Sequence, residues 1–353
     1  MSYQNAMDAL NLIMPKRIPR TEYSASSYWA LIQKVTGLTV DETSPSSVKN
    51  DATRAFEKAW QFDFSWNVDI SRGIFGDLCT SMGHAVYQQG GTDFDSKVYC
   101  PFEDEDEVLA FDPYKAYGER DEAEIIRCFN QRYAQNRALH PDQVVTSGIY
   151  VSMVSGLLEI FGWDMLLLAL GVDQDGMGQV ANRYADWILQ YFKALSKCDA
   201  PVVMVHDDIV WTAGPFVSPE WYRKYVFPNY QKLFEPLYQA GKRVIYTSDG
   251  NYSQFIDDVA ACGVNGFVME PTTDMAYIAQ KYGKTHAFIG NADCRILTYG
   301  TKEEIRREVE RCVDLGRDCP GFIMAVGNHL PASVPVDNAI YYNQVFEELR
   351  DRR

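Results

Sequence analysis

The stretch VIYTSDGN, residues 244–251, joins an apolar run to a polar turn, and it decides the fold. A short run of β-branched and aromatic residues predicts a strand, and Asp-Gly predicts the turn that ends it. Asp249 therefore has two readings. It forms the turn only, or it stands at the end of a barrel strand and takes part in chemistry.

Similar strand-like runs recur from about residue 140 onward, and segments with helical periodicity lie between them. The predicted strands are residues 144–148, 202–206, 243–247, 266–269, 287–290 and 322–326. The predicted helices are residues 220–240, 252–262, 274–282 and 302–315. Strands that alternate with helices in this way form a parallel sheet.

Two earlier runs, residues 18–23 and 62–66, bring the predicted strands to eight, the number in a closed (β/α)₈ barrel. We therefore predict an α/β fold, a single (β/α)₈ TIM-barrel domain over residues 1–353. Within it, residues 1–140 are expected to form an irregular, elaborated N-terminal region. An open doubly wound sheet is the alternative, which is disfavoured because no glycine-rich phosphate loop follows a predicted strand.

Composition narrows the class of partner. The formal net charge of −15 argues against nucleic acid and against an anionic membrane surface. We find no apolar stretch of about 18 residues and no targeting segment, which predicts a cytoplasmic protein without a membrane span. The apolar run at residues 165–170 predicts a buried helix, and the eight scattered cysteines predict reduced thiols.

Ionisable side chains follow the predicted strands. In a barrel the chemistry lies at the carboxyl ends of the strands. The residues found there are His206, Asp207, Asp208, Asp249, Glu270 and His329. Each also has a plainer reading as a turn former, a helix cap or a core histidine.

Several segments resemble the uroporphyrinogen decarboxylase superfamily, which is built on a (β/α)₈ barrel. They are WTAGPFVSPEWYRKYVFPNY at 211–230, YGTKEEIRREV at 299–309, and GNHLPASVPVDN at 327–338, with a weaker match at KRIP, 16–19. The resemblance implies one of two chemistries: decarboxylation of a porphyrinogen, or methyl transfer to or from a corrinoid protein.

The start of the chain bears on this choice. The decarboxylases begin with a Met-Arg-Gln-Ala-Gly-Arg segment that grips carboxylates, whereas this chain has PRTEYS at 19–24, with Glu22 in place of an arginine. A carboxylate at Glu22, in a chain with a net charge of −15, would repel a polycarboxylate. We therefore place Glu22 among the residues predicted to contact a smaller substrate.

The methyltransferase branch binds zinc through His-x-Cys after one strand, an acid further along the chain, and a cysteine in the closing loop. The matching positions here are Thr247 and Asp249, then Glu270, then Asn328 or His329. No thiolate remains among them, and carboxylate and imidazole ligands favour harder coordination and oxygen chemistry. The resemblance implies Asp249, Glu270 and His329 as ligands of a zinc ion.

We therefore expect a methyltransferase that moves a methyl group from a small aromatic methyl ether to the cobalt(I) of a separate corrinoid protein. Cobalamin would be supplied in trans, because no Asp-x-His-x-x-Gly motif occurs. Zinc, or a proton from a side chain, would activate the ether oxygen. The candidates for catalysis are His206, Asp207 and Asp249, and the candidates for lining a ring-shaped pocket are Phe62, Trp66 and Tyr150. Two other readings stay open: a porphyrinogen decarboxylase, and a non-catalytic barrel that acts as a binding module.

Overall fold

The computed structural model describes residues 2–81, 87–88, 91–92, 98–327 and 329–352. The strands are β1 (Phe64–Ser65), β2 (Tyr87–Gln88), β3 (Gly91–Thr92), β4 (Val144–Val145), β5 (Ser147–Ile149), β6 (Val202–His206), β7 (Arg243–Ser248), β8 (Gly266–Met269), β9 (Ala287–Ile289) and β10 (Phe322–Ile323). The helices are α1 (Tyr3–Leu10), α2 (Trp29–Thr36), α3 (Ser46–Ala59), α4 (Glu105–Leu109), α5 (Pro113–Tyr117), α6 (Glu122–Leu139), α7 (Val154–Val172), α8 (Gln174–Lys197), α9 (Pro219–Tyr225), α10 (Phe227–Gln239), α11 (Ile256–Ala261), α12 (Met275–Tyr282), α13 (Cys294–Tyr299), α14 (Lys302–Gly316) and α15 (Val336–Leu349).

The parallel strands close into a barrel. Six of them form one sheet in the order β10, β9, β8, β7, β6, β5, and β4, which pairs in parallel with β1, is separated from β5 only by Thr146. The backbone around Arg20 completes the circle. Asp63 N donates to Arg20 O at 2.9 Å, and Arg20 forms a parallel bridge with Met324, just after β10. The predicted (β/α)₈ barrel is thus confirmed, and the early runs at 18–23 and 62–66 both belong to its wall.

Side chains along each strand alternate between the barrel interior and the surrounding helices. Val202 of β6, Ile245 of β7 and Val268 of β8 belong to the interior cluster. The adjacent Val203 and Tyr246 belong to the outer cluster that packs on the helices. This alternation decides which residues at the strand ends reach the barrel mouth.

Helix α1 packs at the amino-terminal end of the barrel. Its apolar residues Ala6, Ala9 and Leu10 join the interior cluster. Just beyond the helix, Asn11 Oδ1 accepts from Arg243 Nη2 at 2.8 Å, and Arg243 begins β7. Apolar side chains thus fill this end, whereas the polar residues lie at the opposite, carboxyl end of the strands.

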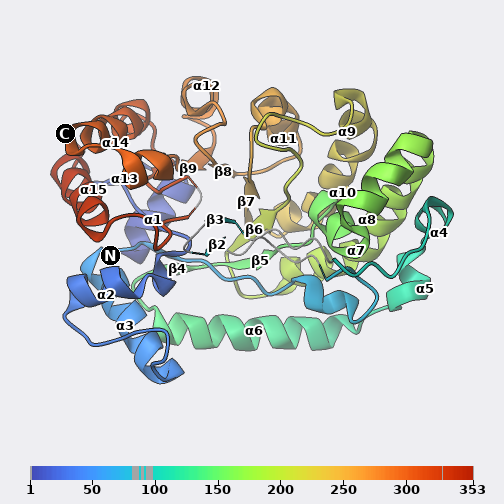
Figure 1. Ribbon diagram of the computed structural model, residues 1–353, viewed down its shortest axis with the longest axis horizontal. Coiled ribbons are helices and arrows are strands. Elements are labelled where there is room, and N and C mark those ends of the chain that lie inside the picture. Colours follow the sequence, from blue (N-terminus) through green and yellow to red (C-terminus); the bar gives the residue numbers. More distant parts are fainter. Residues whose placement is uncertain (1, 82–86, 89–90, 93–97, 328, 353) are drawn as a thin grey trace.

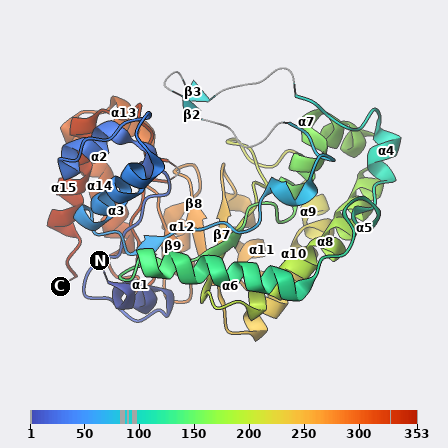
Figure 2. The same ribbon diagram turned by 90° about the horizontal axis from the view of Figure 1, so that it is seen from below.

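The two ends of the chain meet beside the barrel. Helix α2 packs against α15 and against α3, and both views of the molecule show α2 next to α15 (Figures 1 and 2). Arg17 forms ion pairs with Asp351 and Glu347, at 2.8 and 3.0 Å. The segment that closes the barrel is therefore held in place from outside by the C-terminal helix.

Helix α7 extends well beyond the run at 165–170, which is only partly buried: Leu166, Ala169 and Leu170 are buried and Leu168 is exposed. It is long and apolar enough to cross a membrane, but 67% of its most apolar window is buried inside the protein. It kinks at Gly162, whose φ is +72°, and packs against α8. It thus resembles the core helix of a soluble protein.

The predicted helix over 220–240 is two helices, α9 and α10, which meet at Val226. Pro228 lies in the first turn of α10, where a missing N–H costs nothing, so the sequence permits a new helix start there. The predicted start of the helix at residue 302 agrees with the capping residues that the structure shows there. Thr301 and Glu304 form a reciprocal capping box at the start of α14.

Candidate active site

His206 ends strand β6 and points into the barrel, because it lies four residues after the interior Val202. Its ring stacks on Tyr150, with centroids 3.8 Å apart and planes at 7°. Burial lowers the pKa of His206 to about 3. The imidazole is therefore neutral at pH 7 and offers a lone pair to a metal ion or a proton.

Asp208 follows on the same inward face, two residues later. Its Oδ1 lies 3.3 Å from His206 Nε2 and accepts a hydrogen bond from Asp249 N at 2.8 Å. Burial raises the pKa of Asp208 to about 7, and the charges of Asp207 and Glu270 add to the rise. Asp208 is thus a carboxyl group that exchanges a proton near neutral pH.

Asp249, from the opening stretch, joins this pair. It lies four residues after the interior Ile245 on strand β7, and so on the same face. The ligand atoms of His206, Asp208 and Asp249 all lie within 4.8 Å of one another. Asp249 therefore belongs to a group that could hold a metal ion, as well as beginning the turn.

The turn after β7 also positions the carboxylate of Glu270. Gly250 N donates to Glu270 Oε2 at 2.7 Å, so the Asp-Gly dipeptide ties the end of β7 to Glu270, which follows β8. Gly250 has φ +78°, and a Cβ there would lie 2.6 Å from Trp211 O. Only glycine fits, because both the backbone conformation and the close approach of Trp211 exclude a side chain.

His329 is half-buried in the closing loop. Burial lowers the pKa of His329, and the charge of Glu270 partly opposes this shift. The charge of His329 in turn contributes to the lowered pKa of His206. His329 is thus electrostatically coupled to both Glu270 and His206. Asn328, the alternative for this position, lies outside the described residues.

Asp207, predicted as catalytic, faces the other way. Its carboxylate accepts from Val154 N at 3.1 Å and from Ser155 N at 2.6 Å, and it also accepts from Tyr230 Oη. These partners belong to α7 and α10, outside the barrel. Asp207 therefore anchors helices to the strand, and Asp208 replaces it in the candidate site. Strand alternation counted from Val202 was the signal that could have identified Asp208.

Glu22 and Phe62, predicted to contact substrate, also face the helices. Glu22 accepts from Val326 N and Tyr342 Oη, each at 2.9 Å, and pairs with Arg20 at 3.0 Å. Phe62 is 4% exposed and packs edge-on against Phe56, with centroids 5.7 Å apart. Both residues are part of the packing between barrel and helices, so we remove them from the substrate site.

Trp66 and Tyr150 lie on the barrel side, and their contact with substrate stays a prediction. Trp66 stacks on Phe64 of the interior cluster at 5.4 Å, and the ring of Tyr23 lies 5.4 Å from it. The indole Nε1 of Trp66 donates to Thr21 Oγ1 at 2.6 Å. Together with Tyr150 on His206, these rings give the mouth aromatic surfaces.

The donor set fits a divalent metal ion of intermediate hardness. A neutral imidazole and two carboxylates within 4.8 Å of one another match the nitrogen and oxygen ligands that zinc accepts in catalytic sites. Glu270 and His329 are near enough to influence the same group electrostatically. No cysteine belongs to the group that the described residues form.

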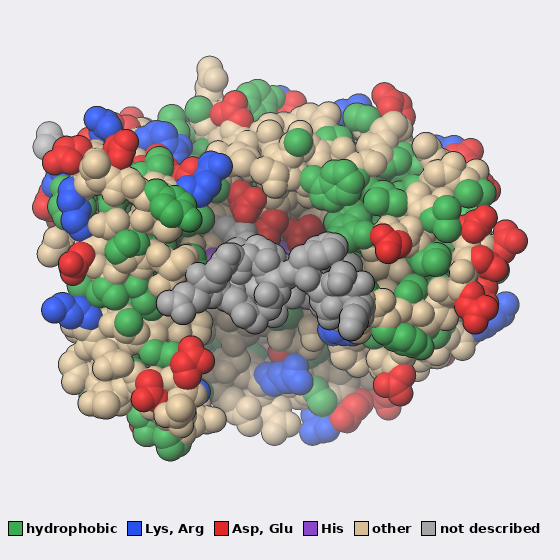
Figure 3. Space-filling view, viewed as in Figure 1, with side chains coloured by type: hydrophobic (Ala, Val, Ile, Leu, Met, Phe, Trp, Pro, Cys, Tyr) green, Lys and Arg blue, Asp and Glu red, His purple; other side chains and the backbone are tan. Residues whose placement is uncertain are grey.

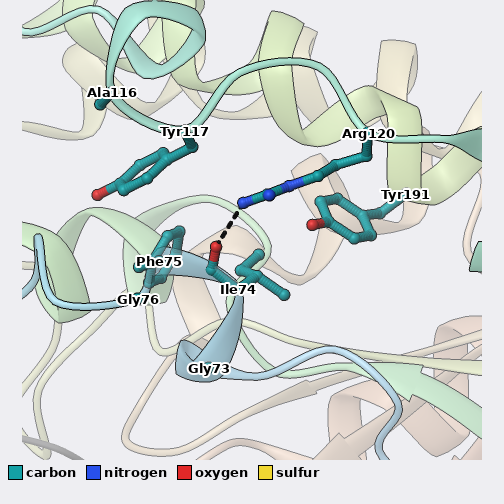
Figure 4. A pocket seen from close by; sticks show the side chains of 8 residues that line it. All are labelled: Gly73, Ile74, Phe75, Gly76, Ala116, Tyr117, Arg120 and Tyr191. Carbon is teal, nitrogen blue, oxygen red and sulfur yellow. Dashed lines mark hydrogen bonds between the residues drawn. The ribbon is translucent and has the colours of Figure 1, made fainter.

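The surface agrees with this location. Figure 3 shows acidic side chains at the floor of a hollow in the centre of the face. A separate hollow of about 480 Å³ lies elsewhere, lined by residues such as Gly76, Tyr117 and Tyr191 (Figure 4). Arg120 borders it and donates to Ile74 O at 2.8 Å. It contains none of the candidate residues.

Comparison with known proteins identifies relatives of part of the chain. The family model described as uroporphyrinogen decarboxylase (URO-D) matches residues 163–349. Uroporphyrinogen decarboxylase of Carboxydothermus hydrogenoformans is 31% identical over 173 residues, which are 48% of this chain and 47% of the relative. That of Aliivibrio salmonicida is 28% identical over 174 residues, with the same shares. The chain thus spans about half the length of the curated relatives it matches.

A solved structure extends the likeness over the whole chain. A methyltransferase from Methanosarcina mazei superposes with a TM-score of 0.65 over 99% of each chain, at 14% identity. At that identity the match concerns the fold alone.

Proposed function

The chain belongs to the uroporphyrinogen decarboxylase family, and within that family we propose that it is a methyltransferase, not a decarboxylase. The proposed reaction moves a methyl group from the oxygen of a small aromatic methyl ether to the cobalt(I) of a separate corrinoid protein. The observation that carries it is the group His206, Asp208 and Asp249 at the barrel mouth, a donor set that could hold a metal ion and contains no sulfur.

The charge of the mouth supports this choice over decarboxylation. A porphyrinogen with many carboxylates would meet Asp208, Asp249 and Glu270 there, and like charges repel. Arg20, the arginine in the segment where decarboxylases grip carboxylates, is completely buried. Its guanidinium donates to Glu22 and Asn343 on the helix side, so it does not face the mouth.

The metal would be held by His206, Asp208 and Asp249, with Glu270 and His329 beside them. When bound, a divalent ion supplies a Lewis acid that stabilises negative charge on an oxygen leaving group. The protein residues have their own tasks. His206 stays neutral because it is buried, and Tyr150 fixes the orientation of its ring.

The backbone contributes the positioning. Asp249 N holds Asp208, and Gly250 N holds Glu270, so the turn after β7 sets the spacing of three carboxylates. The aromatic surfaces of Trp66 and Tyr150 suit a planar substrate ring. In this arrangement the site selects an aromatic oxygen ether by shape and by the hardness of its ligands.

A two-arm assay tests the proposal. The purified protein is mixed with chemically reduced cobalamin and a panel of methoxylated benzoates and phenols, and separately with a porphyrinogen. We expect methylcobalamin and an equal amount of demethylated phenol in the first arm, and no release of carbon dioxide in the second. Carbon dioxide release from the porphyrinogen, without methylcobalamin from any ether, would show that the chain is a decarboxylase.

Metal removal shows whether a metal ion or a protonated side chain activates the ether oxygen. If the metal acts, dialysis against a chelator abolishes transfer and zinc restores it. Full activity after chelation would instead assign activation to a protonated side chain such as Asp208. Activity of neither kind with any substrate would favour the binding module.

A further inference from the structure

Tyr23 lies on the barrel wall opposite the acidic turn. Its segment sits between the strand at Asp63 and the end of β10, with three strands separating it from β7 on either side. The ring packs with the interior cluster and lies 5.4 Å from the ring of Trp66. Across the mouth stand Asp249 and Thr247, both from the β7 segment.

The hydroxyl of Tyr23 is buried and has no hydrogen-bond partner among the described residues. Thr247 Oγ1, two residues before Asp249, is also buried and unpaired within the described ranges. Burying a hydroxyl without a partner destabilises a protein, and phenylalanine would fill the same space without that cost. Each hydroxyl therefore has a donor available for a ligand that enters the mouth.

Burial and the charges around Tyr23 determine which kind of ligand atom its hydroxyl can contact. Burial raises the pKa of Tyr23, and the nearby charges of Glu22 and Asp249 raise it further. The phenol therefore keeps its proton and acts as a hydrogen-bond donor. An ionised carboxylate can only accept, so an oxygen that gains negative charge finds in Tyr23 a donor that an ionised carboxylate does not provide.

We propose that Tyr23 Oη donates a hydrogen bond to the substrate oxygen as it becomes a phenolate, and that Thr247 Oγ1 makes a second contact with it. This inference rests on the methyl transfer proposed above. In that reaction the methyl–oxygen bond breaks, both electrons stay on oxygen, and the methyl carbon bonds to the electron pair of cobalt(I). Tyr23 keeps its proton, and the phenolate takes one from water after release.

The same contact makes Tyr23 a specificity residue. A hydroxyl bonds strongly to a phenolate oxygen and only weakly to a thioether sulfur. Tyr23 therefore favours oxygen ethers over thioethers.

The variant Tyr23→Phe tests the proposal, because it keeps the ring against Trp66 and removes only the hydroxyl. We expect kcat to fall about 10²–10³-fold, as when one donor to a developing oxyanion is removed. KM should change little. The rate should also depend more steeply on the acidity of the leaving phenol, because the variant stabilises the phenolate less.

The thermal midpoint supplies an independent readout. Removing an unpaired buried hydroxyl leaves the midpoint unchanged or raises it. The matched control is Tyr184→Phe, since Tyr184 Oη donates to Val151 O at 2.5 Å in the helix layer. That variant should unfold at a lower temperature and keep the leaving-group dependence of the wild type.

The outcomes are distinct. Suppose that the wild type transfers methyl groups and that Tyr23→Phe has the same rate and the same dependence on the acidity of the leaving phenol. This result would overturn the role of Tyr23 and leave the proposed function standing. If the wild type transfers no methyl group, the proposed function fails. The Tyr23 hydroxyl is then tested separately by calorimetric measurement of the binding of phenol, a probe that resembles the product. Weaker phenol binding in Tyr23→Phe supports the hydroxyl contact, and equal binding overturns it.

Discussion

Asp207 and Asp208 are neighbours in the chain that face opposite sides of the barrel wall. The strand ladder continues past β6, since Asp207 N donates to Thr247 O at 2.9 Å, so side chains keep alternating there. Asp207 bonds to the backbone that begins α7, and Asp208 meets His206 and Asp249 N. One carboxylate is thus structural and the other belongs to the candidate site.

Substitution by asparagine separates these roles. We expect Asp208→Asn to weaken zinc binding by more than the roughly 10–100-fold that is typical when a group hydrogen-bonded to a metal ligand is lost. Its free energy of unfolding should stay unchanged. Asp207→Asn should do the reverse and lower the free energy of unfolding by about 1–3 kcal/mol, because asparagine keeps only one of the two oxygens that accept from Val154 N and Ser155 N. Calorimetric zinc titration and urea unfolding measure the two effects. Equal zinc affinity in Asp208→Asn and the wild type would remove Asp208 from the site.

Zinc affinity should also depend on pH through Asp208. Its pKa is raised to about 7, so below that pH the carboxyl is protonated in the empty site, and a metal ion must displace the proton. Affinity should be nearly constant above pH 7 and fall up to about tenfold per pH unit below it. His206, with a pKa of about 3, adds no competition in this range. A titration with a chelating dye between pH 5.5 and 8 checks this, and a flat profile would contradict it.

At the scale of elements, the turn after β7 positions the acids, and Gly250 makes the turn possible. Gly250→Ala places a Cβ 2.6 Å from Trp211 O at φ +78°, so the turn must move. We expect loss of most methyl transfer and of about 1–3 kcal/mol of stability. Gly241→Ala is the control, because its φ is +72° but no atom lies within 4 Å of the new Cβ. It should cost about 1–2 kcal/mol and leave activity unchanged, as measured by urea unfolding and turnover. Equal loss of activity in both variants would deny the turn a specific role.

The strands were predictable, because β-branched runs alternate with helical periods, and even the irregular run at 18–23 occupies a barrel position. The break between α9 and α10 was not predicted, because the apolar period continues across Val226 and the change of direction depends on tertiary packing. Asp249, Glu270, His206 and His329 could be named from their places after strands. Asp208 was missed because the two adjacent acids were not assigned to faces. Glu22 was misplaced because its partners, Val326 and Tyr342, lie far away in the chain.

At the scale of the whole molecule, the buried pair of Glu22 and Arg20 joins the first barrel segment to the C-terminal region. Glu22→Gln leaves the Arg20 charge buried without compensation, so we expect a loss of about 3–5 kcal/mol in the free energy of unfolding. Arg17→Ala is the control, since its ion pairs are at least partly exposed to solvent and worth about 0–1 kcal/mol each. KM for the methyl donor should be unchanged in both variants. A large rise in KM for Glu22→Gln, with little change in stability, would restore Glu22 to the substrate site.

Nitrogen and oxygen, without sulfur, make up the metal centre that we propose at the mouth of this barrel. X-ray absorption at the zinc edge, on protein loaded with one zinc per chain, tests this ligand set directly. We predict a first shell of nitrogen and oxygen neighbours at about 2.0–2.2 Å, which Asp208→Asn alters. A sulfur neighbour at about 2.3 Å, or failure to retain zinc at any stoichiometry, would contradict it.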